Sequence, residues 1–240
     1  MSLKNVFYLS IRSILFILIF ALISAFSKTS LTEISGFWTL AVIVVNILTI
    51  LILFFICKKE KTNYLDLIKY KKGNTKIKSV VLFSLVSIIA GIGGMYIAGF
   101  ICYNELPYLP VMMVKPIPVV LSIIVILILP ITTTLAEDGL YLGVGVNNIN
   151  NKYCAILIPA FFYAIQHSFI PFLFDTQFII YRFISFLPLT ILFCSYYYCK
   201  KNPLPLMVGH FVLNIATVFQ IFIFSLFPEM YEEMINVKKG

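Results

Sequence analysis

The chain has 240 residues, of which 61% are hydrophobic and 12% are charged, and its formal net charge is +8. Soluble domains have about half apolar and about a quarter charged residues, so this composition excludes an ordinary soluble protein. The apolar residues form runs long enough to cross about 30 Å of hydrocarbon, which takes about 20 helical residues. The sequence therefore predicts an all-α fold, a polytopic transmembrane helix bundle.

In chain order, we predict about seven spans. They cover residues 6–26, 37–57, 79–102, 118–142, 154–170, 178–199 and 204–227. The first run lacks a small-residue cleavage site, so we interpret it as a retained span rather than a signal peptide. The predicted organisation is N-terminal transmembrane helices and a basic loop in 1–117, a core of helices resembling a catalytic unit in 118–227, and a short tail in 228–240.

The loop after the second span carries most of the positive charge. It holds Lys58, Lys59, Lys61, Lys69, Lys71, Lys72, Lys76 and Lys78. Basic residues near span ends mark the cytoplasmic side. This predicts a multi-pass protein of the plasma membrane with a cytoplasmic N-terminus, and it places the loop 147–153 and Lys200–Lys201 on the same side. The lysines indicate topology and attraction to anionic membrane lipid; no nucleic acid partner is expected.

Two features of the spans concern packing. Ala90, Gly94 and Ala98 are four residues apart on the third span and predict a small-residue face for close helix contact. Prolines at 130, 159 and 188 interrupt three successive spans. Such breaks are tolerated where protein or a wet cavity satisfies the freed backbone groups, so the prolines indicate either a cavity or local packing irregularity.

Polar residues gather in the C-terminal half. The two histidines of the chain, His167 and His210, both lie within spans, and Glu137–Asp138 lies on the fourth. Asn214 follows His210 by one helical turn and shares its face. Ionisable groups at membrane depth are costly, which makes them candidates for function. Each group alone also has a plain interpretation, as a packing histidine, an interhelical hydrogen-bond pair or an acidic pair at the membrane edge.

Counting along the helices gives approximate depths. At ~1.5 Å per residue, Glu137 lies roughly 8 to 16 Å from the cytoplasmic end, depending on whether its helix stops at Leu142 or runs to Asn147. His210 comes out at roughly 10 Å and His167 near 20 Å. Tilt or a late helix start is needed to bring the three level.

These side chains can carry out only a few kinds of reaction. A carboxylate can take a proton from a water as general base, and an imidazole with a carboxamide can donate hydrogen bonds to an oxyanion. Together they suffice to hydrolyse a peptide bond without a covalent intermediate or a cofactor. Alternatively, Glu137, His167 and His210 could hold a divalent metal such as zinc, with bound water as the nucleophile.

These residues resemble the motifs of the CPBP intramembrane proteases, also called the CAAX protease or Abi family. The family pattern is EExxxR, then FxxxH, then HxxxN or HxxxD, and this chain has Glu137-Asp138 with Leu142, Tyr163 with His167, and His210 with Asn214. The resemblance covers residues 130–216. It implies that Glu137 activates water with help from His167, and that His210 and Asn214 stabilise the oxyanion. It also implies a membrane-embedded or lipid-modified peptide or protein substrate.

The chain departs from the family pattern at two acidic-motif positions. Asp138 replaces the second glutamate, and Leu142 stands where the family has arginine. The cation expected to orient the carboxylates is therefore missing from the motif, and the nearest basic residues in sequence are Lys152 and Arg182. Two other functions remain open: a catalytically inactive scaffold or regulator that binds another membrane protein, and a transporter or proton relay. A transporter usually shows repeated halves, and none is apparent.

Overall fold

A computed structural model describes residues 3–106, 108 and 110–239. Within these residues every regular element is helical, and six helices are long and apolar enough to cross a membrane. The predicted all-α polytopic bundle is confirmed. The spans, with their turns, cover Val6–Ser27, Leu31–Lys59, Ile77–Tyr103, Val119–Asn148, Thr176–Lys200 and Leu204–Leu226.

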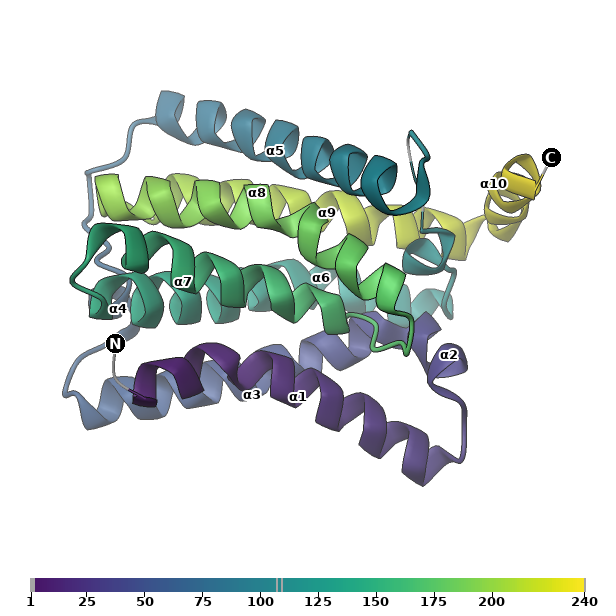
Figure 1. Ribbon diagram of the computed structural model, residues 1–240, viewed down its shortest axis with the longest axis horizontal. Coiled ribbons are helices and arrows are strands. Elements are labelled where there is room, and N and C mark those ends of the chain that lie inside the picture. The colour runs from purple at the N-terminus through teal and green to yellow at the C-terminus, as the bar shows by residue number, and fades with distance from the viewer. Residues whose placement is uncertain (1–2, 107, 109, 240) are drawn as a thin grey trace.

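The elements follow one another with short connections. They are α1 Leu3–Ser27, α2 Leu31–Ile34, η1 Ser35–Phe37, α3 Trp38–Lys59, α4 Tyr64–Leu67, α5 Ile77–Tyr103, η2 Val111–Val114, α6 Val119–Asp138, η3 Gly139–Gly145, η4 Val146–Asn148, α7 Lys152–Ile165, η5 Gln166–Phe169, α8 Thr176–Lys200, α9 Leu204–Leu226 and α10 Pro228–Lys239. The predicted span 154–170 is a shorter helix, α7 of 14 residues, continued by the turn η5. It runs alongside the long helices, and the two ends of the chain lie at opposite ends of the bundle (Figure 1).

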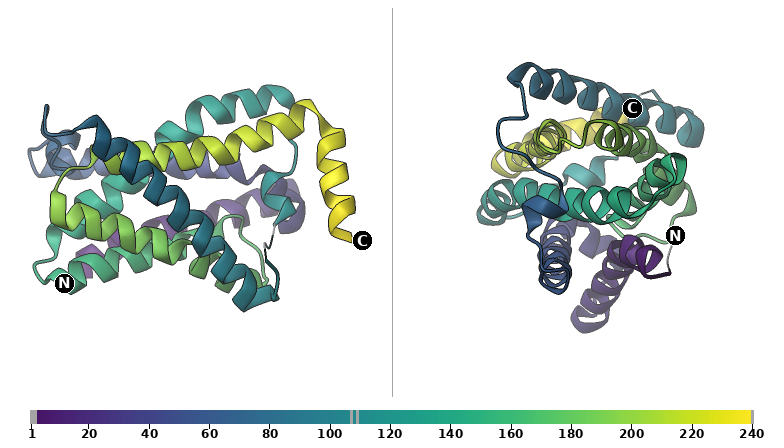
Figure 2. Two further views of the ribbon diagram at one scale, coloured as in Figure 1. Left: turned by 90° about the horizontal axis from the view of Figure 1, so that it is seen from above. Right: turned by 90° about the vertical axis from the view of Figure 1, so that its left-hand side faces the viewer.

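The long helices are stacked in layers. In Figures 1 and 2, α5 forms one outer layer, α8 and α9 the next, α6 and α7 the third, and α1 and α3 the opposite outer layer. Helices in neighbouring layers pack on each other, α5 on α8 and α9, α7 on α8, α6 on α9, and α3 on α6. The ends of α6 and α7 and the start of α9 are therefore enclosed by other helices.

The predicted small-residue face on α5 lies against α8. Gly94 is buried, Ala98 is fully buried, and a Cβ added to Gly94 would overlap the backbone carbonyl oxygen of Ser185. Small residues let helix backbones approach this closely. The prediction of close packing is confirmed at Gly94.

Gly94→Ala is expected to destabilise the bundle because the new methyl group has to push α5 away from α8. Overpacking of this kind typically costs about 1–3 kcal/mol. Gly93→Ala is a matched control, since a Cβ there meets no atom within 4 Å and alanine improves helix propensity. Thermal unfolding in detergent should give a lower Tm for Gly94→Ala alone. Equal Tm values for the two variants would contradict the proposed contact.

The basic loop after α3 packs back onto the bundle. The hydroxyl of Tyr64, on α4, donates a hydrogen bond of 2.8 Å to the carbonyl oxygen of Leu135 on α6. A Cβ on Gly139 would come within 2.7 Å of the Tyr64 ring and of Leu53, so only glycine leaves room for this contact. Burial raises the pKa of Tyr64, which keeps its hydroxyl protonated. The loop is thus attached to the helix that carries Glu137.

Candidate active site

Four of the five side chains singled out from the sequence meet in the centre of the bundle. Glu137 and Asp138 are the last two residues of α6, His167 lies on η5 and His210 on α9. All four are buried, with exposed fractions of 1% or less for the acids and below 10% for the histidines. The π-helical turn η3 follows Asp138 at once, and such turns occur often at functional sites.

One oxygen of Glu137 faces both imidazoles. Its Oε2 atom lies 3.6 Å from Nε2 of His210 and 3.9 Å from Nε2 of His167. This oxygen is buried and accepts no hydrogen bond from the protein. A buried carboxylate oxygen without a donor is unusual, because each such group costs free energy. An acceptor in this position can receive a proton or a hydrogen bond from a small polar molecule.

The proton on His167 can be placed from its backbone contact. Nδ1 of His167 lies 2.9 Å from the carbonyl oxygen of Tyr163, which can only accept. Nδ1 therefore carries the hydrogen, and in the neutral ring Nε2 faces Glu137 as an acceptor. On its other side the imidazole is stacked on Phe186 of α8, with ring centroids 3.7 Å apart. The ring is thus fixed in orientation by two contacts.

Asp138 holds the second imidazole. Nδ1 of His210 lies 3.3 Å from both oxygens of Asp138. The Tyr163 hydroxyl donates to Oδ1 of Asp138 at 3.0 Å and lies 3.2 Å from Nδ1 of His210. Tyrosine in place of the family phenylalanine thus supplies a hydrogen-bond donor to the shorter acid. His210 lies between two carboxylates, with Asp138 at Nδ1 and Glu137 at Nε2.

Asn214 is placed differently from the other four. It follows His210 by one turn of α9, and its side-chain amide donates to the backbone carbonyl oxygen of His210 at 3.1 Å. The side chain is half-buried. Its contact with the cluster therefore runs through the His210 backbone rather than through Glu137 or His167.

The cation that the motif lacks comes from α1. Nη2 of Arg12 lies 2.8 Å from Oε1 of Glu137, and the arginine side chain is completely buried. Of the two basic residues nearest in sequence, Lys152 is exposed, and Arg182 donates to the backbone carbonyl oxygen of His167 with its guanidinium over Phe186. The basic residue beside Glu137 is therefore one that is distant in sequence, and neither Lys152 nor Arg182 takes the place of the motif arginine.

One feature of the sequence could have identified Arg12 as a candidate site residue. It is an arginine inside an otherwise apolar span, and such a residue is a functional candidate by default. Its contact with Glu137 could not be predicted from the sequence, because the two residues are 125 positions apart.

The residues fit a metal poorly. In the described part of the chain, no group of three or more His, Cys, Asp or Glu side chains is arranged to hold a metal ion. Glu137 also has a guanidinium on Oε1, which would repel a dication bound to the same carboxylate.

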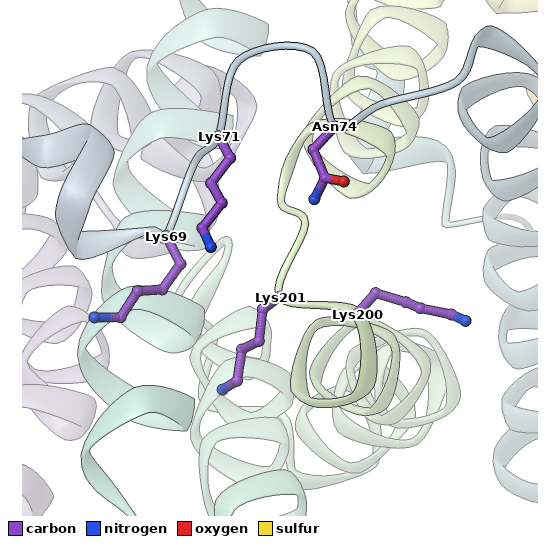
Figure 3. Close-up of a pocket in the computed structure, with 5 residues that line it drawn as sticks. All are labelled: Lys69, Lys71, Asn74, Lys200 and Lys201. Atoms are coloured by element: carbon purple, nitrogen blue, oxygen red, sulfur yellow. The ribbon is translucent and has the colours of Figure 1, made fainter.

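A surface pocket lies at one end of the bundle, lined by other residues than this cluster. A pocket of about 310 Å³, shown in Figure 3, is lined by Lys69, Lys71, Asn74, Lys200 and Lys201. Lys201 donates to the side chain of Asn147 at 3.0 Å, so the basic loop, the turn before α7 and the end of α8 meet at one end of the bundle. Partial burial and then the nearby Lys69 lower the pKa of Lys201. Four of the lysines predicted to share one side of the membrane thus line one pocket.

The site is thus an enclosed cluster of two carboxylates and two imidazoles within a bundle of helices long enough to cross a membrane. Residues 119–216 match the family model of the Rce1-like type II CAAX prenyl endopeptidases. This part of the chain is therefore similar to the CAAX protease family, and the match confirms the resemblance found in the motifs. No curated protein and no solved structure matches the chain.

Proposed function

We propose that the protein is an intramembrane endopeptidase of the CAAX protease type that hydrolyses a peptide bond with water activated by Glu137. The observation that carries the proposal is the buried Oε2 atom of Glu137, which has no donor in the protein and faces Nε2 of both His167 and His210. The family of residues 119–216 supports the same reaction class.

We place the nucleophilic water beside both Glu137 and His167. Both Oε2 and Nε2 are acceptors in the arrangement described, and their separation of 3.9 Å suits a water that donates one hydrogen to each. When the water oxygen attacks the carbonyl carbon, Glu137 takes a proton as general base. The tetrahedral intermediate collapses as the C–N bond breaks, and the proton passes from Glu137 to the leaving nitrogen. The second proton of the water stays on the new carboxyl group, so the products are a carboxylic acid and an amine.

His210 is placed to stabilise the oxyanion. Asp138 accepts from Nδ1 at 3.3 Å, and this contact orients the ring and favours a positive charge on it while Nε2 donates. Preorganised donors in a water-poor site are worth more than the same donors in water. Asn214 is expected to add a second donor, since it lies on the same face of α9, and this requires its amide to leave the carbonyl oxygen of His210.

The substrate class follows from the site's location and from the family. We infer a membrane-embedded or lipid-modified peptide or protein, with prenylated C-terminal peptides as the first class to test, cut near the cytoplasmic interface of the plasma membrane. Membrane lipid surrounds the bundle and contacts its exposed apolar side chains. The favoured mechanism uses no cofactor; a dependence on zinc or another divalent metal is tested below with a chelator.

The test is a cleavage assay with the full chain in lipid vesicles. Prenylated and unmodified membrane peptides with a fluorophore at each end are offered to the wild type and to Glu137→Gln, with and without a chelator. Cleavage by the wild type that is lost in Glu137→Gln and kept with chelator supports the proposal. Equal cleavage by both proteins overturns the role of Glu137. Biological activity that survives both Glu137→Gln and His167→Ala would indicate the scaffold function instead.

The proposed topology can be checked with the natural cysteines. Cys154 and Cys199 are exposed free thiols at the end of the bundle that holds the basic loop. With a cytoplasmic N-terminus, a membrane-impermeant maleimide is expected to label a variant that keeps only Cys154 or only Cys199 in inside-out vesicles and not in right-side-out vesicles. A variant that keeps only Cys102, at the opposite end, is the control with the reverse pattern. Labelling of Cys154 from the outside would contradict the orientation.

A further inference from the structure

The guanidinium of Arg12 is surrounded by four acceptor side chains from three segments, α3, α6 and η5. Besides Glu137, it donates to Oδ1 of Asn46 at 2.9 Å, to Oγ1 of Thr49 at 3.0 Å and to Oε1 of Gln166 at 2.5 Å. Asn46 and Thr49 lie on α3, and Gln166 lies on η5 directly before His167. Arg12 itself lies on α1, outside the segment 119–216 that matches the family. A helix outside the family segment thus reaches the reacting carboxylate.

We propose that Arg12 is a positioning residue, which supplies from α1 the cation that the acidic motif lacks at position 142. The proposal rests on the proposed function, because it assigns Arg12 the task of holding Glu137 in the geometry that activates water. Arg12 does not touch the reacting atoms. It acts through Glu137 and through the turn that carries His167.

The single contact between the two charges explains how the geometry arises. An arginine facing a free carboxylate usually binds both oxygens. Here Nη1 and Nε are occupied by Thr49 and Gln166, so that only Nη2 reaches Glu137, and it reaches only Oε1. Oε2 is left free to face the imidazoles. The neighbours of Arg12 therefore decide which oxygen of Glu137 is available as a base.

Residue 142 lies where an arginine side chain could replace Arg12 as the partner of Glu137. Leu142 lies five residues after Glu137, within the π-helical turn η3, where hydrogen bonds join residues five apart. Its side chain is 1% exposed, and α1 packs against η3. An arginine at 142 would thus start close to Glu137. Arg12 and an arginine at 142 would compete for the same carboxylate, and one of the two suffices to neutralise it.

The test is a pair of substitutions and their combination, Arg12→Met, Leu142→Arg and the double variant. Arg12→Met is expected to lower kcat at least about 100-fold with little change in KM, since a misplaced base affects the transition state more than substrate binding. Leu142→Arg alone is expected to lower the Tm, because it buries a second guanidinium beside the first. In the Arg12→Met background, Leu142→Arg is expected to raise the Tm and to increase kcat at least about tenfold over that of Arg12→Met alone. Lys28→Met, at the exposed end of α1, is the control that is expected to leave both kcat and Tm unchanged.

Two results would overturn the assignment. One is a wild-type kcat for Arg12→Met. The other is additivity, in which Leu142→Arg shifts the Tm by the same amount with and without Arg12. The Tm comparison does not depend on cleavage, so it still tests the role of Arg12 if the protease proposal fails. Failure of the protease proposal would be seen separately, as equal cleavage by the wild type and Glu137→Gln.

Discussion

Replacing Glu137 with glutamine is expected to lower kcat by about 10²- to 10⁴-fold, the usual contribution of a general base. The amide has nearly the same shape as the carboxylate but cannot accept the proton of the attacking water. The measurement is kcat and KM for a peptide substrate in vesicles, normalised to the amount of folded protein. KM should change little, because Glu137 acts on the water rather than on the substrate.

Glu137→Gln also removes one half of a buried ion pair, and this needs its own control. Leaving a buried charge unpaired costs about 3–5 kcal/mol, so a loss of activity could come from unfolding. Glu137→Asp retains the charge beside Arg12 and withdraws the oxygens from His167 by about one methylene length. It should therefore remain folded and still lose most of its kcat. Glu60→Gln removes a carboxylate from the exposed end of α3 and should have wild-type kinetics. High activity in Glu137→Asp would argue against a precisely positioned base.

His210→Ala is expected to have the second largest effect, a fall in kcat of about 10²- to 10³-fold, as for the loss of an oxyanion donor. The imidazole is also the partner of Asp138, so the same change disturbs the orientation of the acid. Asn214→Ala should cost less, because its amide already has a partner in the His210 carbonyl group. Steady-state kinetics of the two variants on one substrate will separate these contributions. A larger effect for Asn214→Ala than for His210→Ala would reverse the roles proposed for them.

The sequence predicted the side chains of the site better than their depths. Glu137 is followed by helical turns as far as Asn148, so the deeper of its two expected depths applies. This brings it within 3.9 Å of His167, which the count along the helix had placed deeper than its partners. Helix tilt and the change from α to π turns decide such distances, and neither can be obtained from residue counts.

The part of the site contributed by α1 and α3 could not be predicted from motifs. Asn46 contacts Arg12 and donates to Oγ1 of Thr133 at 2.8 Å, so it links α1 and α6. These contacts depend on which helices become neighbours in the bundle, and hydrophobic spans carry little information on that choice. The motif residues were identifiable because they lie within one stretch of chain and follow a known order.

The fifth span was predicted too long for a similar reason. Apolar composition continues to Ile170, but α7 ends at Ile165 and the backbone tightens into η5. The change of helix type carries Gln166 and His167 inward, where they meet Arg12 and Glu137. Hydropathy does not distinguish a straight span from one whose last turn is rebuilt around polar partners.

The distance in sequence between Arg12 and Glu137 has a consequence for biosynthesis. The arginine enters the membrane when its carboxylate partner, 125 residues downstream, has not yet been translated. Asn46 and Thr49 arrive after only 34 and 37 residues, so the first helical hairpin can solvate the guanidinium with neutral oxygens while the rest of the chain is made. Glu137 and then Gln166 later join the contacts that Asn46 and Thr49 have begun, so the newly synthesised protein need not hold a bare charge in lipid.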